Sequence, residues 1–234
     1  VMNCIKQAEA RRLEQESSKT YLGLAGDLRF DDLVTKLALG DSHPAIVEGR
    51  ASTIQTTGGS GAVRLAAELF KKIRRGCNVW VSDPTWANHI PLLKSADNNV
   101  HTYSYYQHGE SGVRFAEMMQ QLSAAQAGDV VLLQGSCHNP CGEDLSFEQW
   151  KDLTALLLNR GLMPFVDIAY HGLADDLDRD AQGWRYMADQ VPEMLISYSG
   201  SKNFSLYRDR VGALISISPN AESAHRVLTN MMTI

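Results

Sequence analysis

A lysine placed directly after an apolar run is the residue in this sequence with the clearest chemical potential. Met194-Leu195-Ile196 leads into Ser199-Gly200-Ser201-Lys202, which predicts a buried strand that ends in a tight loop carrying the lysine. In open parallel α/β sheets, ligands bind at the carboxyl ends of the strands. A lysine held among apolar neighbours can lose its proton and attack a carbonyl carbon, forming a Schiff base. We therefore expect the rest of the chain to place a cofactor against Lys202.

Other predicted strands also end at side chains that could face a ligand, namely Trp86 with His89, Asn139, and Asp167 with Tyr170. Asp167 is the most unusual of them, because a carboxylate within an apolar run is costly to bury without a partner. A cationic ring nitrogen would be such a partner. Pyridoxal 5′-phosphate offers one, together with an aldehyde for a lysine, a phenolic oxygen that needs donors, and an aromatic ring face. The strand ends therefore predict a site for this cofactor.

The phosphate of such a cofactor needs a group of hydrogen-bond donors. The glycine-rich run Gly58-Gly59-Ser60-Gly61 opens a predicted helix, and the free N–H groups at a helix N-terminus bind anions. Hydroxyl groups near the lysine and one guanidinium could complete this set, from Ser199, Ser201 and Arg210. One cofactor thus accounts for all of these residues.

Each residue except Lys202 also has an ordinary structural explanation. A single aspartate at a strand end is often a turn residue or helix cap, and Asn-Pro is a common turn. Trp86 could simply pack in its loop, and Arg210 could pair with Asp209 or another acidic side chain at the surface. Their recurrence at successive strand ends favours the ligand site over these separate explanations.

The order of predicted elements indicates an α/β fold in which helices cover both faces of a mostly parallel sheet, a three-layer αβα arrangement. We predict one domain over residues 1–234, with no internal repeat. Strands are expected at residues 79–82, 100–106, 130–133, 163–170 (the strand with its exit), 194–196 leading into the lysine loop, and 211–217. Helices are expected at residues 2–18, 31–39, 58–75, 115–125 and 146–160, and loops at 52–57 and 83–89.

The overall composition limits the partners and the cellular location that this protein can be expected to have. With 44% apolar residues and a net charge of −5, the chain has the composition of a globular domain, and neither nucleic acid nor an anionic membrane is an expected partner. The N-terminal residues lack the apolar core of a signal peptide, and the four cysteines show no disulfide pattern, so we expect a cytoplasmic location. Both ends fall within helical patterns, so we expect the chain to be truncated at both ends.

Three segments together resemble class I pyridoxal-phosphate-dependent aminotransferases, in the aspartate and aromatic-amino-acid branch. They are Ser199 to Gly212, Cys137-His138-Asn139-Pro140, and Asp167-Ile168-Ala169-Tyr170. The segments 55–62 and 79–86 are most similar to bacterial aromatic-amino-acid (tyrosine) aminotransferases. The resemblance implies the large domain of the aspartate aminotransferase-like fold. It also implies transamination of an aromatic amino acid, aspartate or both with a 2-oxo acid such as 2-oxoglutarate.

The resemblance assigns roles to the predicted residues. Lys202 would bind the cofactor aldehyde and transfer the substrate proton, and Asp167, supported by His89, would keep the ring nitrogen protonated. Tyr170 and Asn139 would hydrogen-bond the phenolic oxygen. The remaining contacts are stacking by Trp86, and phosphate binding by Gly59, Ser60, Ser199, Ser201 and Arg210. Tyr21 matches a tyrosine that reaches the phosphate of the neighbouring subunit, which implies a homodimer with shared active sites.

The sequence also departs from the family pattern. Family members are longer at both ends, and the arginine that binds the substrate carboxylate lies beyond residue 234. The usual Pro-Thr is Pro140-Cys141 here, and the usual Gln-Gly after the tyrosine is His171-Gly172. We therefore expect this chain to contain most of the family's large domain and little of its small domain. A non-catalytic cofactor-binding fragment or remnant of such an enzyme is the alternative.

Other chemistries fit less well. A zinc site would have Cys137, His138 and Cys141 but no evident fourth ligand. Ser199-x-x-Lys202 fits a serine–lysine acylase, yet the Lys-Thr-Gly and Ser-Asp-Asn motifs of that class do not occur. A dinucleotide-binding fingerprint fails because position 64 is Arg, and the chain contains no Gly-Lys pair for a phosphate-binding Walker motif.

Overall fold

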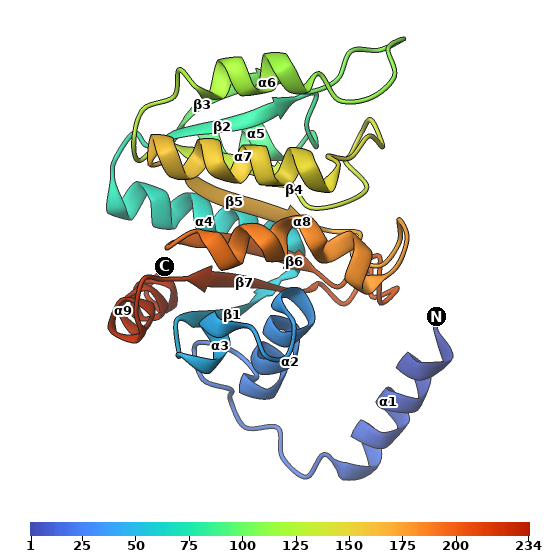
Figure 1. Cartoon of the computed structure of the whole chain (residues 1–234). Coiled ribbons are helices and arrows are strands. Elements are labelled where there is room, and N and C mark those ends of the chain that lie inside the picture. The colour runs from blue at the N-terminus through green and yellow to red at the C-terminus, as the bar shows by residue number, and fades with distance from the viewer.

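A seven-stranded sheet forms the middle layer of the computed structural model, which describes residues 1–234 (Figure 1). Its strands are β1 (Ala51–Thr57), β2 (Asn78–Asp83), β3 (Asn99–Ser104), β4 (Val130–Gln134), β5 (Met163–Ile168), β6 (Met194–Ser199) and β7 (Val211–Ile217). They lie in the order β1-β7-β6-β5-β4-β2-β3. Only β7 runs antiparallel to its neighbours, β1 and β6. The prediction of a mostly parallel sheet is therefore confirmed.

Helices cover both faces of this sheet (Figure 1). They are α1 (Asn3–Gln15), α2 (Leu28–Leu39), α3 (Pro44–Val47), α4 (Gly58–Ile73), α5 (His89–Lys94), α6 (Phe115–Leu122), α7 (Phe147–Arg160), α8 (Leu177–Gln190) and α9 (Ala221–Met232). One apolar core lies between the sheet and α2, α6, α7 and α8, and a second lies between the sheet and α4, α5 and α9. No helix is both long enough and apolar enough to cross a bilayer.

The central strands are buried on both faces because their side chains alternate between the two cores. In β6, Ile196 and Tyr198 belong to the core under α8, while Leu195 belongs to the core under α4. In β5, Val166 belongs to the core under α8, and Phe165 belongs to the core under α4. These continuous apolar runs are what made the central strands predictable.

Local differences from the sequence prediction have identifiable causes. Residues 51–57 form the edge strand β1 instead of a loop, because the polar run Ser52-Thr53 and Gln55-Thr56 is stabilised by antiparallel pairing with β7. Helix α2 begins at Leu28, three residues earlier than predicted, because the Asp27 side chain accepts hydrogen bonds from the first turn. Other elements differ as follows: α4 ends at Ile73, α5 begins at His89, the last residue of the predicted loop, α6 ends at Leu122, and β3 ends at Ser104.

The α1 helix and the segment after it extend away from the sheet (Figure 1). No residue of α1 is buried. Several large apolar side chains are exposed in this region, namely Leu13, Tyr21, Leu22 and Leu24. The first buried side chain after α1 that joins a core is Ala25, which packs into the core under α4 and whose carbonyl accepts a hydrogen bond from Gln55 N–H.

A buried carboxyl group in α2 predicts a pH-dependent stability. Asp31 is only 5% exposed, and neither carboxylate oxygen has a hydrogen-bond partner. Burial raises its pKa from 3.8 to about 7. Because the folded state holds the proton more tightly than the unfolded state, this group's contribution to stability is complete below pH 3.8. It is lost progressively as the pH rises towards 7.

We expect Asp31→Asn to raise the free energy of unfolding by about 2 kcal/mol at pH 8 and by much less at pH 4.5. Urea unfolding of both proteins at the two pH values measures this difference. Asp32→Asn, which changes the exposed neighbouring carboxylate, is the matched control. An Asp31→Asn effect that does not depend on pH would contradict the assignment of a raised pKa.

Candidate active site

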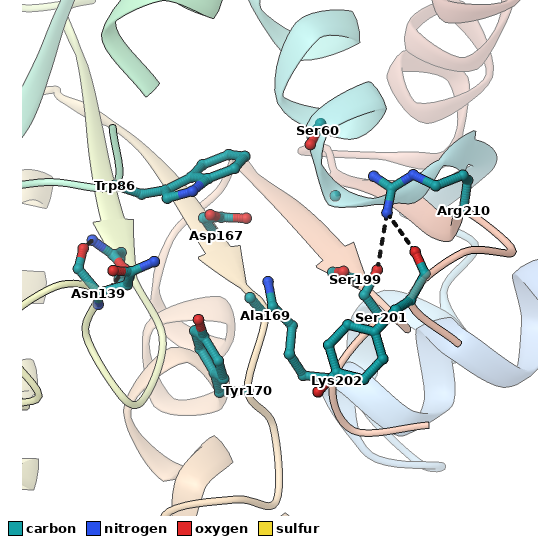
Figure 2. Close-up of a pocket in the computed structure, with 13 residues that line it drawn as sticks. Ser60, Trp86, Asn139, Asp167, Ala169, Tyr170, Ser199, Ser201, Lys202 and Arg210 are labelled. Atoms are coloured by element: carbon teal, nitrogen blue, oxygen red, sulfur yellow. Dashed lines mark hydrogen bonds between the residues drawn. The ribbon is translucent and has the colours of Figure 1, made fainter. Parts of the chain in front are cut away.

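The carboxyl ends of the parallel strands, the start of α4 and the β6–β7 loop surround a cavity of about 200 Å³ (Figure 2). Its lining residues are Gly59, Ser60, Trp86, Gln134, Asn139, Asp167, Ala169, Tyr170, Ser199, Ser201, Lys202, Tyr207 and Arg210. Most of the residues predicted from the sequence therefore meet in one place. The exceptions are His89, which lies behind Asp167, and Tyr21, which is fully exposed outside the cavity.

Asp167 is held by partners on both carboxylate oxygens. Its Oδ2 lies 3.0 Å from Nε2 of His89, and Ser197 donates a hydrogen bond to Oδ1. His89 is fully buried, and its Nδ1 lies 2.7 Å from the hydroxyl of Thr85. The rings of Trp86 and His89 meet edge-on, with their centroids 5.2 Å apart. Trp86 therefore packs against the histidine that holds Asp167. This carboxylate is fixed at the cavity wall, where it can face a cation.

Lys202 supplies an amine to the same cavity (Figure 2). Its Nζ lies 4.9 Å from the centroid of the Tyr170 ring. No carboxylate lies within 4.0 Å of Nζ, so the amine has no counter-ion in the chain. Lys202 is also the only lysine that lines the cavity. A carbonyl compound bound there would meet a single available amine.

Asn139 is positioned by Gln134, a residue that the sequence analysis missed. The Asn139 N–H donates to Oε1 of Gln134 at 2.8 Å, and Nε2 of Gln134 donates to the Asn139 carbonyl at 3.0 Å. Both backbone groups of Asn139 are thereby held, and its side-chain amide is left for the cavity. A polar residue that ends the apolar run of β4 is the sequence signal that could have identified Gln134.

The opposite end of the cavity is suited to an anion. Helix α4 begins at Gly58, so its positive end and free N–H groups face the cavity beside Ser60. Arg210 Nη1 lies 3.4 Å from the Ser201 hydroxyl and 3.1 Å from the Tyr207 carbonyl (Figure 2). Arg210 forms no ion pair, so the predicted alternative of a pair with Asp209 or another surface acid is wrong. Hydroxyl groups, amides and an unpaired guanidinium together form a site for a dianion such as phosphate.

Two glycines are needed for this close approach. A Cβ atom at Gly58, which has a φ of +72°, would lie 2.7 Å from Nη2 of Arg210. A Cβ atom at Gly59 would lie 3.0 Å from Cβ of Ser199. Larger residues would therefore push the start of α4 away from the β6–β7 loop and open the anion site.

The loop that carries Asn139 contains the cysteines considered as zinc ligands. Here His138 Nδ1 lies 3.1 Å from Sγ of Cys141, and its ring stacks on Tyr105 at 4.1 Å. Burial lowers the pKa of His138 to about 4, so the ring is neutral at pH 7. No group of three or more His, Cys, Asp or Glu side chains is arranged to hold a metal ion. These contacts make the loop a packed support for Asn139.

Comparison with known proteins assigns the class. Residues 1–234 match the family model described as "Aminotransferase class I and II", and the chain belongs to this family, as its motifs predicted. It is 41% identical to the aspartate aminotransferase of Haemophilus influenzae over 234 residues, which cover 100% of this chain and 59% of that protein. It is also 41% identical to the aromatic-amino-acid aminotransferase of Paracoccus denitrificans over 221 residues, 94% of this chain and 55% of that protein.

Solved structures agree with this assignment. The crystal structure of an aromatic amino acid aminotransferase from Burkholderia cenocepacia superimposes with a TM-score of 0.97 at 39% identity. It is matched over 100% of this chain and 58% of its own length. A Burkholderia pseudomallei aromatic-amino-acid aminotransferase, described as covalently bound to pyridoxal phosphate, gives a TM-score of 0.96 at 37% identity, over 99% of this chain and 58% of its own length. The predicted fold class is thus confirmed, and the chain spans less than two thirds of these relatives.

Proposed function

We propose that the cavity binds pyridoxal 5′-phosphate through Lys202, and that the protein transfers an amino group between an L-amino acid and a 2-oxo acid. The observation that carries the proposal is the composition of one cavity. A single amine without a counter-ion lies between a fixed carboxylate, Asp167, and an anion site built around Arg210. These are the three groups that the aldehyde, ring nitrogen and phosphate of the cofactor require.

The chain's own residues fit the cofactor at each position. The unpaired Arg210 and the close approach of Gly59 to Ser199 suit a phosphate, and Trp86 supplies an aromatic face for stacking. Asn139 and Tyr170 line the cavity as donors for a phenolic oxygen. Asp167 lies against His89 and Ser197, so it is held in place to keep a proton on the ring nitrogen.

In the proposed reaction, the bound cofactor supplies an electron sink for the negative charge that develops at the substrate Cα. Lys202 first holds the aldehyde and then acts as the base that takes the proton from Cα. The negative charge of Asp167 stabilises the protonated ring nitrogen throughout. Tyr170, whose ring contacts the Lys202 amine, helps to orient that amine.

The substrate assignment follows the family. The relatives are named for aspartate and for aromatic amino acids, which supports proposing either class, or both, as amino donor, with a 2-oxo acid such as 2-oxoglutarate as acceptor. We propose residues 1–234 as an incomplete cofactor-binding large domain. The alternative of a non-catalytic cofactor-binding fragment is less well supported, because the groups proposed for proton transfer and charge stabilisation are all present.

We also propose a homodimer in which Tyr21 reaches the partner's phosphate site. Tyr21 is fully exposed and lies on the segment that extends away from the sheet, with Leu22 and Leu24 exposed beside it. Apolar side chains on an extended segment gain free energy when a second subunit covers them. A cytoplasmic location stays a prediction.

The test is to mix the purified chain with pyridoxal phosphate, record its visible absorption, reduce it with borohydride and map the labelled peptide. We expect one label, on Lys202. Pyridoxal without its phosphate is the control, and it should label much more weakly because the anion site then contributes nothing. Label spread evenly over exposed lysines, or equal labelling by both aldehydes, would argue against the proposed site.

A further inference from the structure

A buried chain of hydrogen bonds lies beside the active-site cavity, on the opposite face of the sheet from Ser197 and Ser199. Tyr198 is between these serines on β6, so its side chain points the other way, into the core under α8. Its hydroxyl lies 2.9 Å from Nδ1 of His171 and 3.0 Å from Nδ2 of Asn203. Tyr198 and His171 are each 1% exposed. The proposed mechanism uses none of these three side chains.

The groups at the two ends of this hydrogen-bonded series determine which atom donates in each of its hydrogen bonds. Nε2 of His171 lies 2.7 Å from the carbonyl oxygen of Leu177, which can only accept, so Nε2 carries a proton. Burial lowers the pKa of His171 and so favours the neutral ring, whose Nδ1 can only accept when Nε2 carries the proton. The Tyr198 hydroxyl therefore donates to His171. Its oxygen accepts from the amide of Asn203.

The two ends of the chain are the direct neighbours of two active-site residues. His171 follows Tyr170, and Asn203 follows Lys202. Within the cavity, the Lys202 amine lies 4.9 Å from the centre of the Tyr170 ring. A single hydroxyl group thus connects the segment after β5 to the loop after β6, immediately next to the residues that must face each other.

His171, at one end of this hydrogen-bonded series, packs against a side chain of α8 that is itself bonded to α2. The Trp184 ring contacts His171 edge-on at 5.0 Å, and the indole N–H of Trp184 donates to the Ala38 carbonyl at 2.9 Å. The asparagine end belongs to a loop without regular secondary structure. The hydrogen bond that Asn203 donates to Tyr198 therefore joins the loop with Lys202 to this anchored group.

We propose that Tyr198 is a positioning residue, which sets the place of Lys202 relative to Tyr170 through Asn203 and His171. The proposal rests on the proposed function, because it assumes that Lys202 binds the cofactor. Small displacements of a reacting group reduce rates strongly, and 1 Å can lower a rate by about 100-fold. Loss of this hydroxyl should therefore change the reactivity of Lys202 as well as the stability of the fold.

The test compares Tyr198→Phe with Tyr103→Phe. The Tyr103 hydroxyl is an apt control, because it is also 1% exposed and donates a hydrogen bond of 2.8 Å, to the Leu132 carbonyl. Each substitution removes one buried hydroxyl, so both should lower the melting temperature by a similar amount. Only Tyr198→Phe should slow covalent attachment of pyridoxal phosphate, by about tenfold. It should also move the pH at which the absorbance of the bound cofactor changes, by about half a unit.

Asn203→Ala serves as a second variant, because it truncates a half-buried loop side chain and leaves the core intact. It should change the attachment rate in the same direction by a smaller factor. Wild-type attachment rate and pH midpoint in both Tyr198→Phe and Asn203→Ala would overturn the positioning role. A wild-type chain that takes no label on Lys202 would instead overturn the proposed function, and the positioning role with it.

Discussion

Lys202→Ala is expected to abolish borohydride-reducible attachment of pyridoxal phosphate and to lower transamination by about 10⁴-fold or more. The physical reason is that Lys202 is the only amine in the cavity, so no neighbour can replace it as nucleophile or as base. The visible spectrum of the mixture, followed by reduction and mass measurement of the chain, gives the first result. The rate of the half-reaction with an amino acid gives the second.

Two further variants make this test specific. Lys94→Ala removes an exposed lysine on α5 outside the cavity and should leave both attachment and rate unchanged. Lys202→Arg keeps a positive charge in the cavity but supplies no nucleophile, so it should behave like Lys202→Ala. Reducible attachment that persists in Lys202→Ala at the wild-type level would show that the amine has been assigned wrongly.

The second large effect is expected at Asp167. Replacing it with alanine should lower the half-reaction rate by about 10³-fold, because no other carboxylate lines the cavity to balance a protonated ring nitrogen. Asp167→Glu keeps the charge and should lose far less. Asp167→Asn keeps the approximate shape but not the charge, so it should resemble the alanine variant.

Stopped-flow measurement of the absorbance change with an aromatic amino acid compares these rates. Asp209→Asn is the control, since it neutralises an exposed carboxylate that makes no ion pair and lies one residue from Arg210. If Asp167→Ala and Asp167→Glu react equally fast, Asp167 is a turn residue, and the charge assigned to it has no part in the reaction.

The central strands and the residues at their ends were predictable from the order of apolar and polar side chains. Runs such as Met194-Leu195-Ile196 are apolar at every position, which in an α/β arrangement is typical of a strand buried on both faces. Glycine, serine and lysine directly after such a run then mark a loop at the ligand-binding edge of the sheet. By contrast, the edge strand β1 is polar and half-buried, so only its pairing with β7 identifies it.

The contacts that hold the site residues in place could be found only in the folded chain. The contact between His89 and Asp167 joins side chains 78 positions apart, and that between Tyr198 and His171 joins side chains 27 positions apart. Both depend on the order and register of neighbouring strands, with Asp167 of β5 directly opposite Ser197 of β6. Local propensity carries no information about such pairs, because a hydrogen bond depends on tenths of an ångström between atoms that only the complete fold brings together.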